Sequence, residues 1–423
     1  MSYIADLHIH SGFSRATSPE MTPEGIWRWA QLKGISVIGT GDFTHPGWFN
    51  EISERLEPAG NGLLCLKKEY LREDIPQSCR SDVFFMLTGE ISCIYSKDRK
   101  TRKVHCVLIV PDMATAARIN ITLSRIGNLR SDGRPILGLD AKELLRITLD
   151  TSPDAMLVPA HIWTPHFSVF GAASGFDSLE GCFEELTPYI SAVETGLSSD
   201  PPMNWRFSRL DNITLISNSD AHSPSKIGRE ANIFEGDISY KGIIEAIKTR
   251  RGLRGTIEFF PEEGKYHYDG HRACGVCLSP EETRVYNYIC PVCSRHLTIG
   301  VMHRVIALAD RDNGKKPEGA PGYRSIIPLS EVIAETLKTN PNSKAVINSY
   351  YRLISALGPE FRILLDTPYA DIKGVSDQLI AEAIKRMREG RVHISPGFDG
   401  EYGKIKIFED TERDPLRGQL SLF

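Results

Sequence analysis

The chain has 423 residues, of which 41% are hydrophobic and 25% are charged, and its formal net charge is −4. This composition is typical of a globular protein of two or three domains, and it excludes binding of polyanions through overall positive charge. No apolar run reaches the ~18 residues needed to cross a membrane, and the first strand begins by Tyr3, which leaves no room for a signal peptide. We therefore expect a cytoplasmic protein without membrane partners.

The first 255 residues alternate short apolar segments with helical patterns. Thr22-Pro23, a run of apolar residues and a stop at Gly34 predict a capped helix. Buried strands are predicted at 83–88, 104–110, 156–159 and 213–217, and a last helix at 240–248. This rhythm is typical of a parallel α/β barrel.

Side chains that bind metals adjoin these apolar segments, in the order ADLHIHSG, IGTGDFTH, LTGEIS, KVHCVLIV, VPAHIW and ISNSDAHSP. The candidate ligands are His8, His10, Asp42, Glu90, His105, His161, Asp220 and His222. A parallel barrel gathers the ends of its strands at one mouth, so these imidazoles and carboxylates would converge there. Clustered divalent metals generate hydroxide at neutral pH and bind phosphate, which predicts a metal-dependent phosphoesterase.

Each of these segments alone has a simpler explanation. Alternation along a strand puts both imidazoles of an HxH pair on one face by default. Glu90 could be an ion-pair partner, and His105 could be a core histidine. The recurrence of such residues at six apolar segments favours the joint metal site.

The order of these segments resembles that of the PHP (polymerase and histidinol phosphatase) family over residues 1–255. The resemblance implies a distorted seven-stranded α/β barrel that holds two or three divalent metals (Zn²⁺, Mn²⁺ or Mg²⁺) at its mouth. It also implies that Glu90 bridges metals, and that Asp220 and His222 act with it in catalysis. Many family members have adjacent Asp and His in the second segment, whereas Asp42 and His45 are separated here, and Asp42 is the predicted ligand.

Two CxxC pairs, Cys274/Cys277 and Cys290/Cys293, are separated by residues 278–289. Four thiolates in this arrangement predict a structural Zn²⁺ site with no open position, in a linker and zinc ribbon over residues 256–300. Two disulfides or reactive thiols are the alternative. Disulfides are disfavoured because the other five cysteines are scattered, mostly in apolar runs.

Residues 301–415 are predicted to form a mainly helical DNA-binding domain. Apolar residues at helical spacing predict helices at 343–357 and 376–389, each followed by glycine, and a strand is predicted at 404–408. The region contains the basic residues Arg304, Arg311, Lys315, Lys316, Arg324, Lys344, Arg352, Arg386 and Arg388. They predict either a phosphate-binding surface or an ordinary solvated face.

The complete order of barrel, ribbon and helical domain resembles the endonuclease Q family. The resemblance implies a DNA-repair endonuclease that cuts 5′ to deaminated bases (uracil, hypoxanthine, xanthine) or abasic sites and leaves a 3′-hydroxyl and a 5′-phosphate. Such an enzyme would flip the damaged base out of the stack. Trp163, Phe167 and Phe170 are candidates for the base pocket, or they pack over the barrel rim. Arg15, Lys226 and Arg229 are candidate phosphate ligands, with simple surface exposure as the alternative.

Two other functions are compatible with the sequence: a PHP-type phosphatase acting on histidinol phosphate or a nucleotide, and a non-catalytic DNA-binding module. The ribbon and helical domain disfavour the first, and the near-complete set of ligands disfavours the second.

The last residues, 416–423, end in QLSLF. This motif resembles the peptide with which bacterial DNA-processing enzymes bind the sliding clamp, through Gln419, Leu420, Leu422 and Phe423. The alternative is docking of the apolar terminus onto its own domain.

Overall fold

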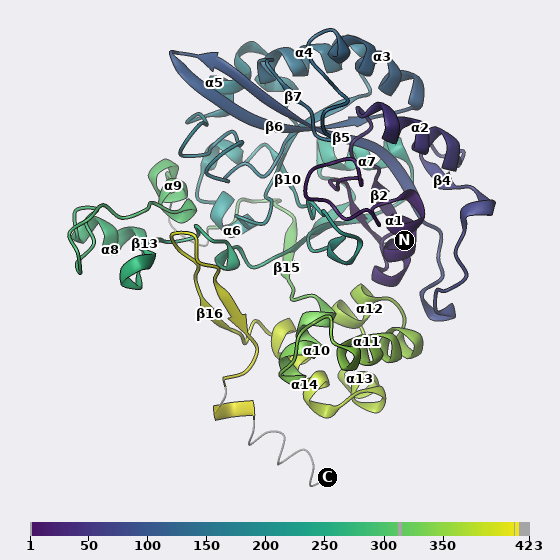
Figure 1. The fold of residues 1–423 in the computed structure, drawn as a ribbon, viewed down its shortest axis with the longest axis vertical. Helices are drawn as coiled ribbons and strands as arrows, with labels where there is room; N and C mark the ends of the chain where they lie inside the picture. The colour runs from purple at the N-terminus through teal and green to yellow at the C-terminus, as the bar shows by residue number, and fades with distance from the viewer. Residues whose placement is uncertain (1, 312–314, 410, 414–423) are drawn as a thin grey trace.

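The protein is described by a computed structural model that covers residues 2–311, 315–409 and 411–413. Figure 1 shows an α/β part, a group of helices α10–α14 beside it, and a small ribbon that projects from one side. The strands are β1 (Ser2–Asp6), β2 (Val37–Gly39), β3 (Leu56–Pro58), β4 (Leu64–Leu66), β5 (Phe84–Lys97), β6 (Lys100–Val110), β7 (Ile136–Leu137), β8 (Met156–Pro159), β9 (Ala192–Glu194), β10 (Thr214–Ile216), β11 (Ala231–Glu235), β12 (Leu253–Glu258), β13 (Asp269–His271), β14 (Val276–Leu278), β15 (Gly322–Ser325), β16 (His393–Ser395) and β17 (Lys404–Lys406). The helices are α1 (Pro23–Lys33), α2 (Pro46–Arg55), α3 (Met113–Ser124), α4 (Ala141–Thr151), α5 (Leu179–Phe183), α6 (Pro201–Asn204), α7 (Tyr240–Thr249), α8 (Pro280–Val285), α9 (Val301–Leu308), α10 (Leu329–Leu337), α11 (Lys344–Leu357), α12 (Glu360–Leu365), α13 (Tyr369–Val375) and α14 (Gln378–Arg388).

The main sheet is mixed. β1, β2 and β5 pair in parallel, whereas β11 runs antiparallel to β1, and β6 runs antiparallel to both β5 and β8. β9 and β10 form a separate parallel pair. The predicted α/β fold is confirmed, but its strands are not all parallel. The reason is local: Asp98 and Arg99 both have positive φ and join β5 to β6 in a two-residue hairpin, which produces antiparallel neighbours.

The first helix is confirmed at the predicted positions. Thr22 Oγ1 accepts a hydrogen bond from the Gly25 N–H, Pro23 occupies the first turn, and Gly34 ends the helix with φ of 85°. A Cβ at Gly34 would lie 2.9 Å from the Pro359 ring, so this glycine also allows the helical group to approach α1.

A buried ion pair fixes the helical group against the α/β part. Lys33 Nζ lies 3.0 Å from Glu360 Oε2, and both side chains are buried. Glu360 also accepts hydrogen bonds from the Tyr350 hydroxyl at 2.8 Å and the Leu329 N–H at 3.0 Å. Because the charges are paired and hydrogen-bonded, removal of one partner would leave an uncompensated buried charge.

The main sheet includes strands from both sides of the predicted domain boundaries. The predicted linker from 256 is wrong at its start, because β12 continues to Glu258 inside the main sheet. β15 pairs with β12, so the region after 300 contributes a strand to the same sheet. The helices predicted at 343–357 and 376–389 are confirmed as α11 and α14, and β17 confirms a strand from 404. In the described parts of the chain, no helix is both long and apolar enough to cross a membrane.

Candidate metal-dependent active site

Two groups of metal-ligand side chains meet inside the α/β part. His8, His10, Glu90 and Asp220 form one group, and Glu90, His105 and His161 form the other, with the ligand atoms of each group within 4.8 Å of one another. Glu90 belongs to both. Its Oε2 lies 3.3 Å from His10 Nε2, and its Oε1 lies 2.7 Å from His105 Nδ1. This shared carboxylate places the two groups side by side.

The sheet brings these residues together from distant parts of the chain. His8 and His10 follow β1, and Asp220 follows β10, where its N–H donates to the His8 carbonyl. Glu90 and His105 lie within β5 and β6 rather than at strand ends, because this hairpin continues beyond the first residues of β5, which are the ones that pair with β2. The predicted convergence of the ligands is therefore found. The difference from the prediction is that Glu90 and His105 lie on a hairpin and not at the ends of strands.

Three polar residues of the site have left-handed backbone conformations. Asp42, His161 and Asp220 have φ of 47°, 30° and 48°. Such conformations cost free energy in residues with a Cβ and cluster at functional sites. Gly196 accommodates the turn at His161, since a Cβ there would lie 2.4 Å from the His161 Cβ.

Asp42 is absent from both ligand groups of the described chain. Its Oδ1 lies 3.0 Å from His10 Nδ1, and its Oδ2 accepts hydrogen bonds from the Ser11 N–H and hydroxyl and from the Ser14 hydroxyl. The prediction of Asp42 as a ligand is corrected here: it orients the imidazole of His10 from behind. His45 caps α2 by accepting from the Trp48 N–H.

Glu194, at the end of β9, was missed in the sequence. Both of its carboxylate oxygens lie 3.0 Å from His8 Nδ1, and it also accepts from the His161 N–H and from Asn218 Nδ2, each at 2.9 Å. It therefore orients His8 as Asp42 orients His10. The sequence signal was a carboxylate directly after an apolar strand, without a histidine beside it.

Arg134 was also missed. Its Nη1 lies 3.1 Å from Glu90 Oε2, and its side chain is 28% exposed. The loop that carries it is fixed over the mouth, because the Gly133 N–H donates to the Phe13 carbonyl at 3.0 Å. A Cβ at Gly133 would lie 2.2 Å from Asp42 Oδ2, so only glycine fits there. A guanidinium thus reaches the ligand groups from the solvent side.

His222 follows Asp220 and lies outside both described ligand groups. Its ring centroid is 4.5 Å from that of His10, and its Nδ1 lies 2.8 Å from the Asp220 carbonyl oxygen. Partial burial lowers the pKa of His222, so its imidazole is neutral at neutral pH. A neutral ring that donates from Nδ1 keeps a lone pair on Nε2 for a metal or a proton.

The electrostatics of the two groups fit divalent cations. Burial opposes protonation of His8 and His10, but the surrounding carboxylates raise the pKa of both imidazoles well above the usual value. Burial alone would raise the pKa of Glu90, but the histidines around it hold that pKa well below the usual value. His8 Nε2, His10 Nε2 and Asp220 Oδ1 are buried and make no hydrogen bond of good geometry among the described residues, although His10 Nε2 lies 2.9 Å from Asp220 Oδ1. The lone pairs of such nitrogen and oxygen atoms can bind a metal ion.

The predicted base pocket is only partly found. Trp163 and Phe170 are 1% and 0% exposed, and Trp163 Nε1 donates to Asn204 Oδ1 at 2.7 Å. They are core residues, so their assignment to a base pocket is wrong. Phe167 is half-buried with φ of 61°, and its ring centroid lies 4.7 Å from that of His105. Phe167 is therefore the one residue of the predicted set that borders the metal groups.

The predicted phosphate ligands have different surroundings. Arg15 is exposed at the mouth, with 84% of its side chain accessible. Lys226 Nζ is paired with Glu331 Oε1 at 2.7 Å, across the contact between the α/β part and α10. Arg229 stacks on Phe259, with 5.1 Å from its guanidinium carbon to the ring centroid. Arg15 Nε lies 3.4 Å from Asp132 Oδ2, but this exposed side chain can still turn to a ligand, whereas the other two pack between elements.

Several basic residues after 300 are likewise engaged within the protein. Arg304 pairs with Asp177, Arg311 pairs with Asp211, and Arg388 donates to the backbone carbonyls of residues 363, 364 and 367. Lys344 and Arg352 on α11 are exposed. A phosphate-binding surface on this part would therefore depend on fewer cations than the sequence suggested.

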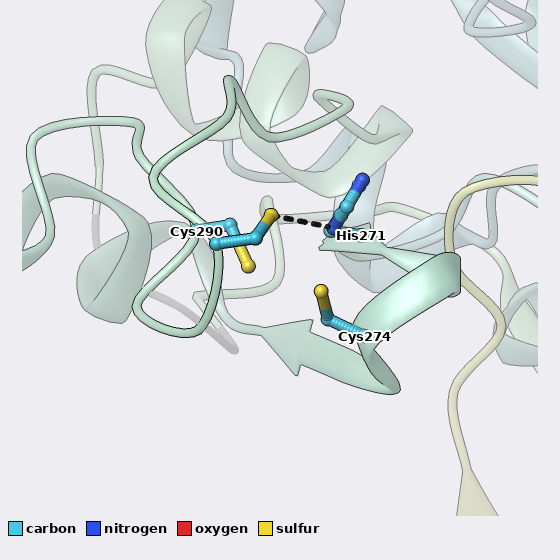
Figure 2. Close-up of side chains that lie close together, drawn as sticks. His271, Cys274 and Cys290 are labelled. Atoms are coloured by element: carbon cyan, nitrogen blue, oxygen red, sulfur yellow. Dashed lines mark hydrogen bonds between the residues drawn. The ribbon is translucent and has the colours of Figure 1, made fainter.

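A third group of metal-ligand atoms lies in the ribbon. It comprises His271, Cys274, Cys290 and Cys293, within 4.8 Å of one another (Figure 2). Cys277, a predicted ligand, is not part of this group, and His271 was missed. The donor set of sulfur and imidazole nitrogen fits zinc.

An α/β fold with two ligand groups that share one carboxylate, open to solvent beside an arginine, defines a metal-dependent phosphoesterase. The crystal structure of the lesion-specific endonuclease Q of Pyrococcus furiosus is similar, with 32% identity and a TM-score of 0.84 over 97% of this chain and 96% of that chain. An endonuclease Q bound to a 27-mer duplex with an abasic lesion at its active site is also 32% identical, with a TM-score of 0.82 over 98% of each chain. The chain belongs to the endonuclease Q family and is a metal-dependent endonuclease.

Two family models match parts of the chain. The PHP-associated model matches residues 203–251, and the MJ0043 C-terminal domain model matches residues 328–391. Protein MJ0043 of Methanocaldococcus jannaschii is 33% identical over 270 residues, which are 62% of this chain and 33% of that protein. The matched region therefore spans about a third of the length of that relative.

Proposed function

We propose that this protein is a DNA-repair endonuclease that hydrolyses the phosphodiester 5′ to a deaminated base (uracil, hypoxanthine or xanthine) or an abasic site, leaving a 3′-hydroxyl and a 5′-phosphate. The observation that carries the proposal is the pair of ligand groups sharing Glu90, in a chain that matches, over nearly its full length, an endonuclease Q bound to duplex DNA with an abasic lesion.

The residues of the site would bind two cations, contact the phosphate and transfer a proton. His8, His10, Glu90 and Asp220 would hold one cation, and Glu90, His105 and His161 a second. Divalent cations supply Lewis acidity, which activates water and neutralises charge on a phosphate. Arg134, next to Glu90, would donate to a non-bridging phosphate oxygen. His222 would accept or donate a proton at Nε2, since Asp220 fixes its Nδ1.

A macromolecular substrate is supported by the shape around the mouth. A cavity of about 630 Å³ lies between the loops that carry Ser18 and Ser223 and the helices α10 and α11. Ser18 N–H donates to the His222 carbonyl, so one end of this cavity lies beside the loop that carries His222. Phe13, which is 38% exposed, and Phe167 offer aromatic faces near the ligand groups for an extruded base.

The experiment is a nicking assay on end-labelled duplexes that carry one uracil, hypoxanthine, xanthine or abasic site, beside an undamaged duplex and a free phosphomonoester. We expect one cut, 5′ to the lesion, with a 3′-hydroxyl. Asp220→Asn should abolish cutting yet retain duplex binding, because it removes a charged ligand and keeps the shape. Hydrolysis of monoesters without DNA cleavage would support the small-molecule phosphatase instead, and binding without any cleavage would support a non-catalytic module.

We also propose that the C-terminal QLSLF binds a bacterial sliding clamp. Its residues Gln419, Leu420, Leu422 and Phe423 lie outside the described part of the chain. The support is the sequence pattern itself, together with the advantage of tethering a DNA enzyme to its substrate. Deletion of residues 419–423 should abolish binding to purified clamp and leave nicking of short duplexes unchanged. Equal clamp affinity with and without these residues would refute the proposal.

A further inference from the structure

Two loops of the ribbon have the same local geometry. One loop reads His271-Arg272-Ala273-Cys274-Gly275, and the other reads Cys290-Pro291-Val292-Cys293-Ser294. In each, a metal-ligand side chain is followed three residues later by a cysteine and then by a residue with positive φ, 63° at Gly275 and 59° at Ser294. The loops therefore match when His271, not Cys274, is taken as the first ligand of its loop.

The ligand atoms converge in the same arrangement. His271 Nδ1 lies 3.4 Å from Cys293 Sγ, and the atoms of His271, Cys274, Cys290 and Cys293 lie within 4.8 Å of one another. Figure 2 shows the side chains of His271, Cys274 and Cys290 pointing toward a common centre.

Cys277 points away from this centre, and the strand register explains why. In the β13–β14 hairpin, His271 pairs with Val276 and Gly270 pairs with Cys277. Consecutive residues of a strand point to opposite faces, so His271 and Cys277 lie on different faces of the hairpin. Cys277 Sγ instead lies 3.9 Å from the Pro396 carbonyl oxygen, next to β16.

We propose that the zinc of this ribbon is held by His271, Cys274, Cys290 and Cys293, and that Cys277 is not a ligand. Zinc accepts a tetrahedral set of three cysteines and one histidine as readily as four cysteines. With a neutral imidazole in place of a thiolate, the site carries one negative charge less. The ligand set does not depend on the proposed DNA substrate.

The proposal is tested on full-length protein purified with its zinc. Zinc per chain is measured for wild type, Cys277→Ser, His271→Ala and His271→Cys, while the ligands in the α/β part stay unchanged. We expect Cys277→Ser to retain all of the zinc of wild type. His271→Ala should lose one zinc per chain, and His271→Cys should recover it, because it recreates a four-ligand site.

Cobalt substitution counts the thiolates directly. The ligand groups of the α/β part contain no cysteine among the described residues, so sulfur-to-cobalt charge-transfer bands report on the ribbon alone. Their intensity should be equal in wild type and Cys277→Ser, and should rise by about a third in His271→Cys, where four thiolates replace three. Loss of a zinc and of band intensity in Cys277→Ser, or retention of all zinc in His271→Ala, would overturn the assignment. If His271→Ala fails to fold, the wild-type and Cys277→Ser spectra still decide.

Discussion

Glu194→Gln isolates the contribution of a residue that touches a metal ligand without being one. Glu194 accepts from His8 Nδ1, the His161 N–H and Asn218 Nδ2 at 2.9–3.0 Å. Glutamine has one carbonyl oxygen, and its amide would point N–H groups at one of these donors. A buried donor without a partner costs about 1–3 kcal/mol. Loss of such a contact to a ligating histidine typically weakens metal binding by about 10–100-fold, or about 1.4–2.8 kcal/mol, so the two estimates agree.

The assay measures metal affinity by competition with a chromophoric chelator, and nicking rate as a function of metal concentration. We expect the variant to bind metal about 10–100-fold more weakly. Its rate should recover to within a few-fold of wild type at saturating metal, because every ligand is still present. Glu180→Gln, on the exposed surface of α5, is the matched control and should behave as wild type. An unchanged metal affinity, or a rate that excess metal does not restore, would refute the positioning role of Glu194.

Three further outcomes are expected. Arg134→Ala should lower kcat/KM for DNA by about 100-fold, the scale of a lost donor to a transition-state oxyanion, with metal content unchanged; a normal kcat/KM would contradict the phosphate contact. Phe167→Ala should reduce the preference for damaged over normal duplex by about 1–3 kcal/mol if a base stacks there, whereas Trp163→Phe, a core change, should alter thermal stability and leave that preference intact. Burial raises the pKa of Glu258 to about 8, so its stabilising protonated form is present at low pH and is lost as pH rises through 8. Glu258→Gln should therefore have a free energy of unfolding at pH 9 that is higher than that of wild type by on the order of 4 kcal/mol. Urea unfolding of both proteins at pH 6 and pH 9 measures these free energies, and the advantage of the variant should be smaller at pH 6.

The ligands of the active site could be read from the sequence because their signal is local. An apolar strand followed by histidine or aspartate identifies a buried strand whose polar side chain has no ordinary place in a core, as at His8 and Asp220. The ends of the first helix could also be predicted, because Thr22 and Gly34 make their capping hydrogen bonds to residues within one helical turn. These strand ends and helix caps depend on residues that are neighbours in the sequence, and they are therefore found in the folded structure as predicted.

Other features depended on side-chain direction and on distant partners, which only the tertiary structure decides. Asp42 proved to orient His10, because the turn after β2 points its carboxylate at Nδ1 rather than into the ligand groups. Trp163 was a candidate for the base pocket, with packing over the barrel rim as the alternative, and the fold buries it against Asn204.

In the ribbon, the register of the β13–β14 hairpin decides which side chains face the ligand group. Two CxxC pairs predicted four thiolates, yet alternation along β13 and β14 turns Cys277 away and brings His271 in. The sequence thus determined which residue types are present for the chemistry, and long-range packing determined which of them face the metals and which orient the others.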